Sequence, residues 1–389
     1  MYFLVEYHYN KKNKMLKKIS DFFKIEFHSD RIYGFDIIRT LAISTVIYGH
    51  GSLLTPVTPG STYALSTEFL DGVFVFFILS GFLIGQLLIY TLDNKPTTKA
   101  TLVDFWKKRF LRTLPAYYFT LLVLILISLL TIDGFGNIKT LFYFIFIQNF
   151  ATYHPFFFAE AWTLSIEVWF YILIPLTAFL LKGYCKLSTK KSLLYTALFY
   201  VILGIIIRSI RYYSLTEIDG TVIDFAFRKQ VITRIDSVTF GVFGAWIFHY
   251  YNAIWERYKN ISLVLGIAVF LYTKFPIFEH GYYYRTVIFY SLQSLSFLLI
   301  LPFFSYIKTG KGVIFKIITT LSYVSFSIYL INLNLVQLFI INNINFGSLS
   351  GNYLIIVKYF LYLLLTIVGG IYMYKKIELP FMNMRKKLK

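Results

Sequence analysis

Residues 34–54 of the chain read GFDIIRTLAISTVIYGHGSLL, a mostly apolar run that carries Arg39 and His50. A run of this length can cross a bilayer, because about 20 apolar residues at roughly 1.5 Å per residue span the hydrocarbon core. A cation in that core costs about 2.5 kcal/mol or more, so it indicates a function. Arg39 and His50 are about three helical turns apart, which places them on one helix face roughly 16 Å apart in height. The alternative is an arginine that extends to the interface and a histidine that only packs.

The composition is that of a helical protein with many membrane crossings. Of the 389 residues, 57% are hydrophobic and 21% are aromatic, and the mean hydropathy is +0.64. A soluble domain of this size does not have such values. The formal net charge is +19, but the basic residues lie between apolar runs rather than on one face, which argues against nucleic acid as a partner. The single cysteine, Cys185, allows no internal disulfide, and the chain shows no paired spacing of metal ligands.

The apolar runs predict an all-α fold with ten membrane-spanning helices and both termini on the cytoplasmic side. Most of the 38 Lys and Arg residues then lie in inner segments, as the positive-inside rule requires. The expected organisation is a basic cytoplasmic lead at 1–33, a transmembrane domain at 34–373 and a basic cytoplasmic tail at 374–389. The expected spans are residues 34–54, 69–92, 114–132, 161–181, 193–211, 234–252, 261–276, 286–306, 321–341 and 354–373.

One further apolar run, residues 138–150, is too short to cross. As a helix it reaches only about 20 Å, against roughly 30 Å for the hydrocarbon core. A crossing here would also place the basic loop after residue 181 on the outer side. We therefore expect 138–150 to be re-entrant or interfacial, and the whole segment 133–160 to form an outer cap.

The lead contains the basic cluster KKNKMLKK at residues 11–18. Such a cluster favours the inner face of the membrane and its anionic lipid headgroups. Residues 15–27 can form an amphipathic helix on the membrane surface, and a partly disordered tail is the alternative.

The depths of the polar residues in these spans indicate which of them meet. His50 lies about four residues, and Glu167 about six, below the outer ends of their spans. A carboxylate that holds one ring nitrogen of a histidine fixes its tautomer and raises its basicity, so these two are a candidate base and orienting group. Arg234 and Asp236 enter a later span at a similar level. Two residues apart on a helix, they point to different faces and are not each other's simple partner, and interfacial anchoring is their alternative role.

Two arginines near the inner face form a second candidate site. Arg109 and Arg112 in KKRFLR lie three residues apart, so they share one face of a helix entry. Two guanidinium groups at a membrane boundary can hold phosphates. The alternative is charge that only sets the topology, which fits the two adjacent lysines. With Arg39 between this site and His50, the arrangement suits a long anionic donor that enters from the cytoplasm and delivers a group outward.

The order and spacing of these elements resemble membrane acyltransferase family 3, the integral-membrane O-acyltransferases of bacterial surface glycans and related acceptors. The resemblance covers most of the chain. Two positions depart from the family pattern, because Phe74 stands where an aspartate is usual and Asn332 where a histidine is usual. The matching elements are the Arg-x10-His spacing of Arg39 and His50, FFILSGFLI at 76–84, KRFLRTLPAYY at 108–118, TLSIEVWFYILIP at 163–175, RIDSVTFG at 234–241, SFSIYLINLNL at 325–335 and IELPF at 377–381.

The resemblance implies the substrates and the place of action. The donor would be acyl-CoA, most often acetyl-CoA, with no bound cofactor. The acceptor would be a hydroxyl of a cell-surface polysaccharide or a lipid-linked sugar, and the enzyme would lie in the bacterial cytoplasmic membrane.

The resemblance also implies roles for the donor-side residues. Arg109 and Arg112 would hold the CoA phosphates, and Arg39 would orient the donor. His50, oriented by Glu167, would act as general base on the hydroxyl or first take the acyl group as an acyl-imidazole.

Four further residues would bind the acceptor or support the site. Arg234 and Asp236 are polar candidates near the outer side, and Asn332 could donate a hydrogen bond to the acceptor. Trp162 could stack on a sugar ring, and an interfacial aromatic belt is the alternative for it.

Two other functions compete with acyl transfer. A transporter or flippase of a glycolipid or glycan precursor would also use intramembrane Arg, His and Glu. Many transporters show paired repeats with broken helices, and this sequence shows none. The other alternative is a non-catalytic membrane scaffold with a decayed site. Asn332 is the one feature in its favour, and the other candidate site residues are all retained, which argues against decay.

Overall fold

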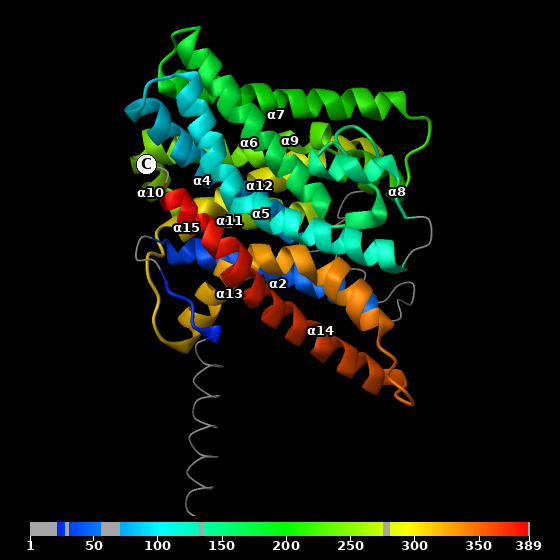
Figure 1. The fold of residues 1–389 in the computed structure, drawn as a ribbon. Helices are drawn as coiled ribbons and strands as arrows, with labels where there is room; N and C mark the ends of the chain where they lie inside the picture. The colour runs from blue at the N-terminus through cyan, green and yellow to red at the C-terminus, as the bar shows by residue number, and fades with distance from the viewer. Residues whose placement is uncertain (1–21, 28–30, 56–70, 132–134, 275–280, 388–389) are drawn as a thin grey trace, which may run out of the picture.

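The computed structural model describes residues 22–27, 31–55, 71–131, 135–274 and 281–387. Over these ranges the chain forms helices joined by turns and short loops, without a strand. Figure 1 shows one bundle of long helices that run back and forth along a common direction. The all-α expectation is confirmed.

Nine helical segments in the described part of the chain are long and apolar enough to cross a membrane. They belong to nine of the ten expected spans, so the protein is an integral membrane protein. They are α2 (Tyr33–Gly51) with η1 (Ser52–Leu54), α4 (Gly72–Asn94), α5 (Lys99–Thr131), α6 (Ala161–Gly183), α7 (Thr189–Ser214), α9 (Val231–Tyr250), η5 (Tyr284–Ile288) with α12 (Phe289–Ser305), α13 (Gly312–Ile331) with η6 (Asn332–Ile340) and η7 (Ile341–Asn343), and α14 (Gly351–Met373) with η8 (Tyr374–Glu378) and α15 (Leu379–Lys387).

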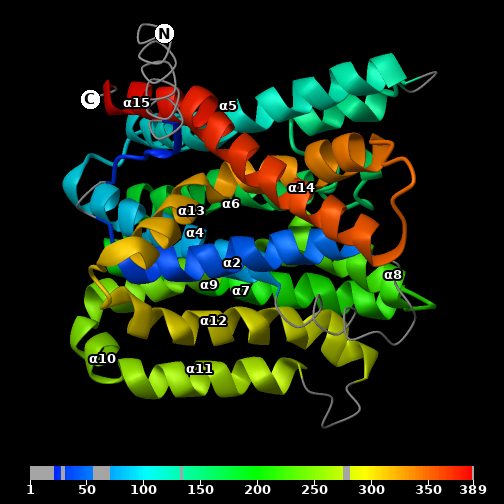
Figure 2. The same cartoon turned by 90° about the horizontal axis from the view of Figure 1, so that it is seen from below.

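The tenth expected span, 261–276, is the shorter helix α11 (Lys259–Lys274). Its 16 residues cover about 24 Å, which is less than the roughly 30 Å of a hydrocarbon core. It lies alongside α12 at one edge of the bundle (Figure 2) and follows the six-residue helix α10 (Asn252–Arg257).

Helices α4 and α9 approach closely in the middle of the bundle. A Cβ atom on Gly81 would lie 1.9 Å from the carbonyl oxygen of Val238, and one on Gly241 would lie 2.2 Å from that of Ile78. Only glycine permits such contact, as at other small-residue helix interfaces in membranes. This packing fixes the wall of α4 against which the site described below is built.

The expected start of the span 114–132 is wrong, because helix α5 also includes the residues before 114 that were expected to form an inner loop. It begins at Lys99, so Arg109 and Arg112 lie inside a helix of 33 residues rather than at its entry. The helix is about 50 Å long, more than the hydrocarbon core requires. Its first turns can therefore extend beyond the membrane with their lysines. The 19 residues after Arg112 cover about 28 Å, which places the two arginines near one edge of the core.

The segment 138–150 does not cross, as expected. It contains the short 3-10 helix η2 (Ile138–Phe144), and η3 (Phe156–Phe158) follows it. Two side chains of long helices, one buried and one partly buried, hold the backbone of this cap segment, residues 135–160. Tyr117 donates to the carbonyl oxygen of Tyr143 at 2.9 Å, and Trp169 donates to that of Phe146 at 2.9 Å. The cap segment is thereby anchored to α5 and α6.

Most of the surface helix considered for residues 15–27 lies outside the described residues. Phe22, Ile25 and Phe27 are described, and they pack against the core. The ring of Phe27 stacks on Tyr323 of α13 with centroids 5.8 Å apart. The end of the lead therefore returns to the bundle.

Candidate active site

A pocket of about 90 Å³ lies between α2, α4, α5, α6 and α13. Its charged lining residues are Arg39, Arg109, Arg112 and Glu167, so three guanidinium groups face one carboxylate. Most of its other lining residues are apolar or aromatic. Such a pocket suits an anionic ligand with an uncharged, partly apolar end.

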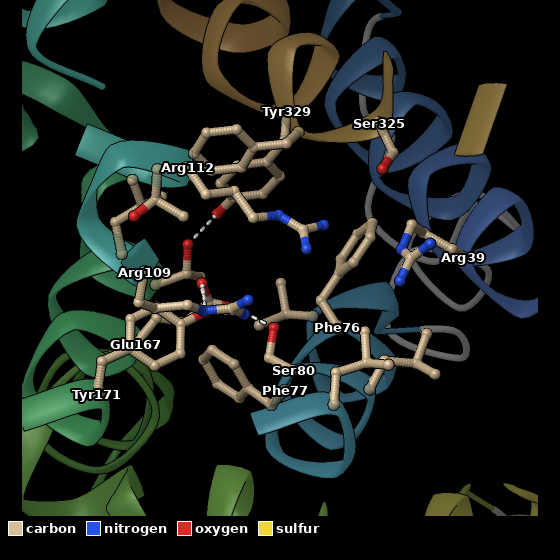
Figure 3. A pocket seen from close by; sticks show the side chains of 17 residues that line it. Arg39, Phe76, Phe77, Ser80, Arg109, Arg112, Glu167, Tyr171, Ser325 and Tyr329 are labelled. Carbon is tan, nitrogen blue, oxygen red and sulfur yellow. Dashed lines mark hydrogen bonds between the residues drawn. The ribbon is translucent and has the colours of Figure 1, made fainter. Parts of the chain in front are cut away.

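Figure 3 shows how the arginines are arranged around this pocket. The guanidinium group of Arg112 points into the middle of the space. Arg109 lies along one wall beside Glu167 and Tyr171, and Arg39 extends from α2 on the opposite side. Helices α2 and α5 thus bring the three arginines to one pocket, although Arg39 was expected between the other two and His50.

Hydroxyl groups connect Arg109 to Glu167. The Nη2 atom of Arg109 donates to the Tyr171 hydroxyl at 3.0 Å, and that hydroxyl donates to Glu167 Oε2 at 2.8 Å. Ser80 of α4 donates to the other carboxylate oxygen, Glu167 Oε1, at 2.8 Å. The carboxylate is thus held on both oxygens, and the cation lies one hydroxyl away from it.

Arg39 is held by a polar cluster at the start of α2. Its Nη1 atom donates to Ser322 Oγ at 3.1 Å and lies 3.6 Å from Asp36 Oδ1. Asp36 also accepts from Ser322 at 2.6 Å and forms an ion pair with Arg31. One carboxylate therefore faces two arginines, so Arg39 keeps positive charge available to the pocket.

His50 lies near the other end of α2, and its ring turns inward to α13. Its Nδ1 atom is hydrogen-bonded to Asn332 Oδ1. The amide nitrogen of Asn332 donates to the carbonyl oxygens of Ile328 at 3.0 Å and Tyr329 at 2.8 Å. Because these two bonds fix the amide orientation, only a carbonyl oxygen faces the imidazole, and Nδ1 must carry the proton. The Nε2 atom of a neutral His50 is then the basic nitrogen.

Tyr329 connects His50 to the pocket. His50 itself is not among the pocket-lining residues, whereas Tyr329 and Thr163 are. The Thr163 hydroxyl donates to the Tyr329 hydroxyl at 2.8 Å, and the backbone of Tyr329 holds the Asn332 amide. The structure therefore gathers the arginines and Glu167 at one pocket and places the histidine next to its far wall.

The model of a known protein family, described as an acyltransferase domain, matches residues 32–375. The chain belongs to acyltransferase family 3. OatA from Staphylococcus aureus, an O-acetyltransferase by name, is 31% identical over 166 residues, which cover 38% of this chain and 27% of OatA. YrhL from Bacillus subtilis is 30% identical over 192 residues, which cover 43% of this chain and 27% of YrhL.

A third relative is Nodulation protein 10 from Rhizobium leguminosarum bv. viciae. It is 29% identical over 167 residues, which cover 36% of this chain and 43% of that protein. The chain thus spans about a quarter of the length of OatA and YrhL and less than half of Nodulation protein 10. No solved structure matches this member of the family.

The structure corrects one expected pairing in this acyltransferase-family site. Glu167 is bonded to Ser80 and Tyr171, and His50 is bonded to Asn332 instead. Glu167 lines the pocket together with the arginines, whereas His50 does not line it. The asparagine that replaces the usual histidine of the family thus has a definite contact.

Arg234 and Asp236 are not partners, as expected, but neither is an interfacial anchor because both are fully buried. Asp236 is paired with Arg208 of α7 through two bonds of 2.8 and 2.7 Å. The Arg234 guanidinium lies 4.4 Å from the ring centroid of Phe74 and 4.5 Å from that of Tyr290. At the position where the family usually has aspartate, an aromatic ring therefore faces this cation.

Trp162 packs inside the bundle beside a cation. Its side chain is buried, and the guanidinium group of Arg228 lies 5.1 Å from its ring centroid. The guanidinium group therefore lies over one face of the ring. His154 in the cap segment is likewise buried, and its Nε2 atom is bonded to the Phe158 carbonyl group.

A charged cluster of Asp71, Asp224, Arg228 and Lys229 lies at the cap end of the bundle. Arg228 contacts Asp71 at 2.9 Å and Asp224 at 3.0 Å. Burial works against the charged form of Asp71, but the positive charges of Arg228, Lys274 and Arg234 together outweigh it and lower the pKa of Asp71. Charges in this cluster act on His50, so the imidazole lies in the field of ionised groups on its cap side.

Sequence reasoning missed Tyr171, Ser80 and Arg208. Tyr171 follows Glu167 by four residues, and this spacing alone places the two side chains on one helix face. Ser80 lies within the family-like segment FFILSGFLI, but it is uncharged, so the sequence alone did not mark it as a site residue. Arg208 was placed at the end of a span, although the helix continues to Ser214 and buries it completely.

Proposed function

We propose that the protein transfers an acyl group, in the first place acetyl, from acyl-CoA to a hydroxyl group of a glycan or lipid-linked sugar. The observation that carries this proposal is a pocket with three arginines beside a histidine whose Nε2 atom is left basic by Asn332. The family and the O-acetyltransferase name of OatA support the reaction class.

The arginines would bind the donor. CoA carries several phosphate charges, and Arg39, Arg109 and Arg112 present guanidinium groups from two helices to one space. A pocket of about 90 Å³ has room for a small acyl group. The positive-inside rule places the start of α2 and the end of α4 on the cytoplasmic side, so the donor would enter there.

His50 would then act as general base. Its Nε2 atom takes the proton of the acceptor hydroxyl while the oxygen attacks the thioester carbonyl carbon, and the C–S bond breaks as the new C–O ester bond forms. The proton passes to the departing thiolate, which leaves as the CoA thiol. Asn332 stabilises the protonated ring by continuing to accept from Nδ1–H.

A second route is compatible with the same residues. In it, Nε2 of His50 attacks the thioester carbonyl carbon, the C–S bond breaks and the CoA thiolate leaves. The acyl group then passes from the ring to the acceptor oxygen, whose proton goes to the thiolate. Isolation of an acylated His50 peptide after donor addition without acceptor would support this route. Its absence under single-turnover conditions, while transfer proceeds, would support direct transfer.

Mass analysis of surface polysaccharide from cells with and without the gene tests the proposal. We expect a mass difference of one acyl unit that disappears with His50→Ala, while the variant is inserted and folded. His249→Ala is the matched control, because this exposed histidine lies at the end of α9. Wild-type transfer by the His50→Ala protein would overturn the assignment, and donor-independent movement of a lipid-linked sugar would favour a transporter instead.

A further inference from the structure

The break between α13 and the π-helix η6 lies directly beside the His50 contact. Helix α13 ends at Ile331, and Asn332 is the first residue of η6. A change from α-helical to π-helical pairing leaves backbone N–H groups without their usual acceptors. Here the next two N–H groups, those of Leu333 and Asn334, donate to Glu160 Oε1 at 3.0 and 2.9 Å. A carboxyl group of the cap segment therefore closes the break.

Three further bonds tie the same part of the cap segment to both sides of Asn332. After it, Asn334 donates to the carbonyl oxygen of Phe157 at 2.9 Å and accepts from the N–H of Ala159 at 2.9 Å. Before it, the Tyr329 hydroxyl donates to the backbone carbonyl oxygen of Glu160 at 3.2 Å. The backbone that carries Asn332 is thus held from both sides by residues 157–160.

We propose that Glu160 is a positioning residue for acyl transfer, which acts by holding Asn332 against His50. This inference rests on the proposed function, because it assigns Glu160 a role through the proposed base. Without the carboxyl acceptor, the N–H groups of Leu333 and Asn334 would lose these two bonds. The local backbone would then rearrange, and the Asn332 side chain would move with it.

The surroundings of Glu160 explain how a carboxyl group can be buried at this place. Its side chain is 1% exposed, and burial raises the pKa of Glu160 to about 8. The group is then mostly neutral at pH 7, and its Oε1 atom can accept both N–H bonds in that form. The Oε2 atom has no hydrogen-bond partner among the described residues. Glutamine has the same shape and keeps one acceptor oxygen, so it can replace the glutamate.

The test compares three variants of the full-length enzyme in lipid nanodiscs, with rates measured per folded molecule. For Glu160→Ala we expect kcat to fall by about 100-fold, because small misplacements of a catalytic group have such effects. The KM for acyl-CoA should stay within about twofold, because the arginines lie on other helices. Glu160→Gln should retain most of the wild-type kcat. Asn137→Ala is the control, since it removes a similar side-chain acceptor for a backbone N–H elsewhere in the cap segment.

A double-mutant cycle distinguishes positioning from general support of the fold. In an Asn332→Ala background, Glu160→Ala should cost less than about threefold, because the contact it maintains is already gone. Hydrogen exchange gives a readout independent of activity, and the peptide containing Leu333 and Asn334 should exchange faster in Glu160→Ala but not in Glu160→Gln.

Additive effects in the cycle, or equal loss in Glu160→Gln and Glu160→Ala, would overturn the positioning role. Either result combined with an inactive His50→Ala would leave the proposed function intact. An active His50→Ala would instead refute the proposed base, whatever the exchange data show.

Discussion

Replacing Asn332 with leucine tests the assignment of His50 most directly. Leucine has a similar volume but offers no acceptor to the Nδ1–H group of His50. A buried donor that loses its partner costs about 1–3 kcal/mol. If the lost bond destabilises the catalytically competent orientation of the His50 ring by this amount, kcat falls by about 5- to 150-fold, since 1.36 kcal/mol corresponds to a factor of ten. The donor KM should change little, because Asn332 does not line the arginine pocket.

The assay is acyl transfer from labelled acetyl-CoA to the acceptor identified by mass analysis, with purified enzyme in nanodiscs. Asn332→Asp is the variant to compare with it, because a carboxylate still accepts from Nδ1 of His50 and favours the imidazolium form. We expect it to retain activity and to shift the acidic limb of the pH–kcat profile upward. Asn343→Leu is the control, because this exposed asparagine donates to the nearby carbonyl oxygens of Leu338 and Phe339. Wild-type kcat in Asn332→Leu would refute the reasoning about the tautomer.

Four further outcomes are expected. Arg109→Ala should raise the acyl-CoA KM by about tenfold or more with a smaller change in kcat, which a donor titration measures, and an unchanged KM would remove it from donor binding. Gly81→Ala should lower Tm and yield, because its Cβ would lie 1.9 Å from a backbone oxygen, and a wild-type Tm would contradict the described helix contact. Arg208→Ala should destabilise the fold by about 3–5 kcal/mol by leaving Asp236 buried and unpaired, and Arg208→Met with Asp236→Leu should recover much of the Tm. Because the native pKa of Glu160 is raised from 4.5 to about 8, the folded protein binds the extra proton, so its contribution to stability is present below about pH 4.5 and is lost as the pH rises to 8. Tm measured across this range should therefore fall less steeply in Glu160→Gln, and parallel curves would contradict the shift.

The sequence was sufficient to predict the helices because each span is a long apolar run between polar segments. The sequence did not predict where α5 begins, because the apolar run starts at about residue 114 but the helix starts at Lys99. Hydropathy reports where a segment meets lipid, and a helix can continue into water beyond that point. The expected loop therefore became part of the helix that carries Arg109 and Arg112.

Only part of the site was predicted, because the sequence gives the depth of a residue along a span but not its contacts. Spacing and depth predicted Arg109 and Arg112 near the inner side and Glu167 near the level of His50, whereas Glu167 lines the pocket of the arginines. They do not report the rotation of each helix about its axis, which decides contacts. The contact of His50 with Asn332 depends on how α13 is turned toward α2. Asn332 was recognised only as a departure from the family pattern, with another role expected for it.

The buried pair of Arg208 and Asp236 has a consequence for biogenesis. The two residues are on separate helices, α7 and α9, and 28 positions apart in the chain. If each helix left the translocon alone, each would bring an uncompensated charge into lipid at a cost of about 2.5–3.5 kcal/mol. A lower-energy path keeps α7 beside the translocon until α9 emerges, so that both charges enter the bilayer already neutralised. Insertion of this part of the chain would then proceed by hairpins rather than by single helices.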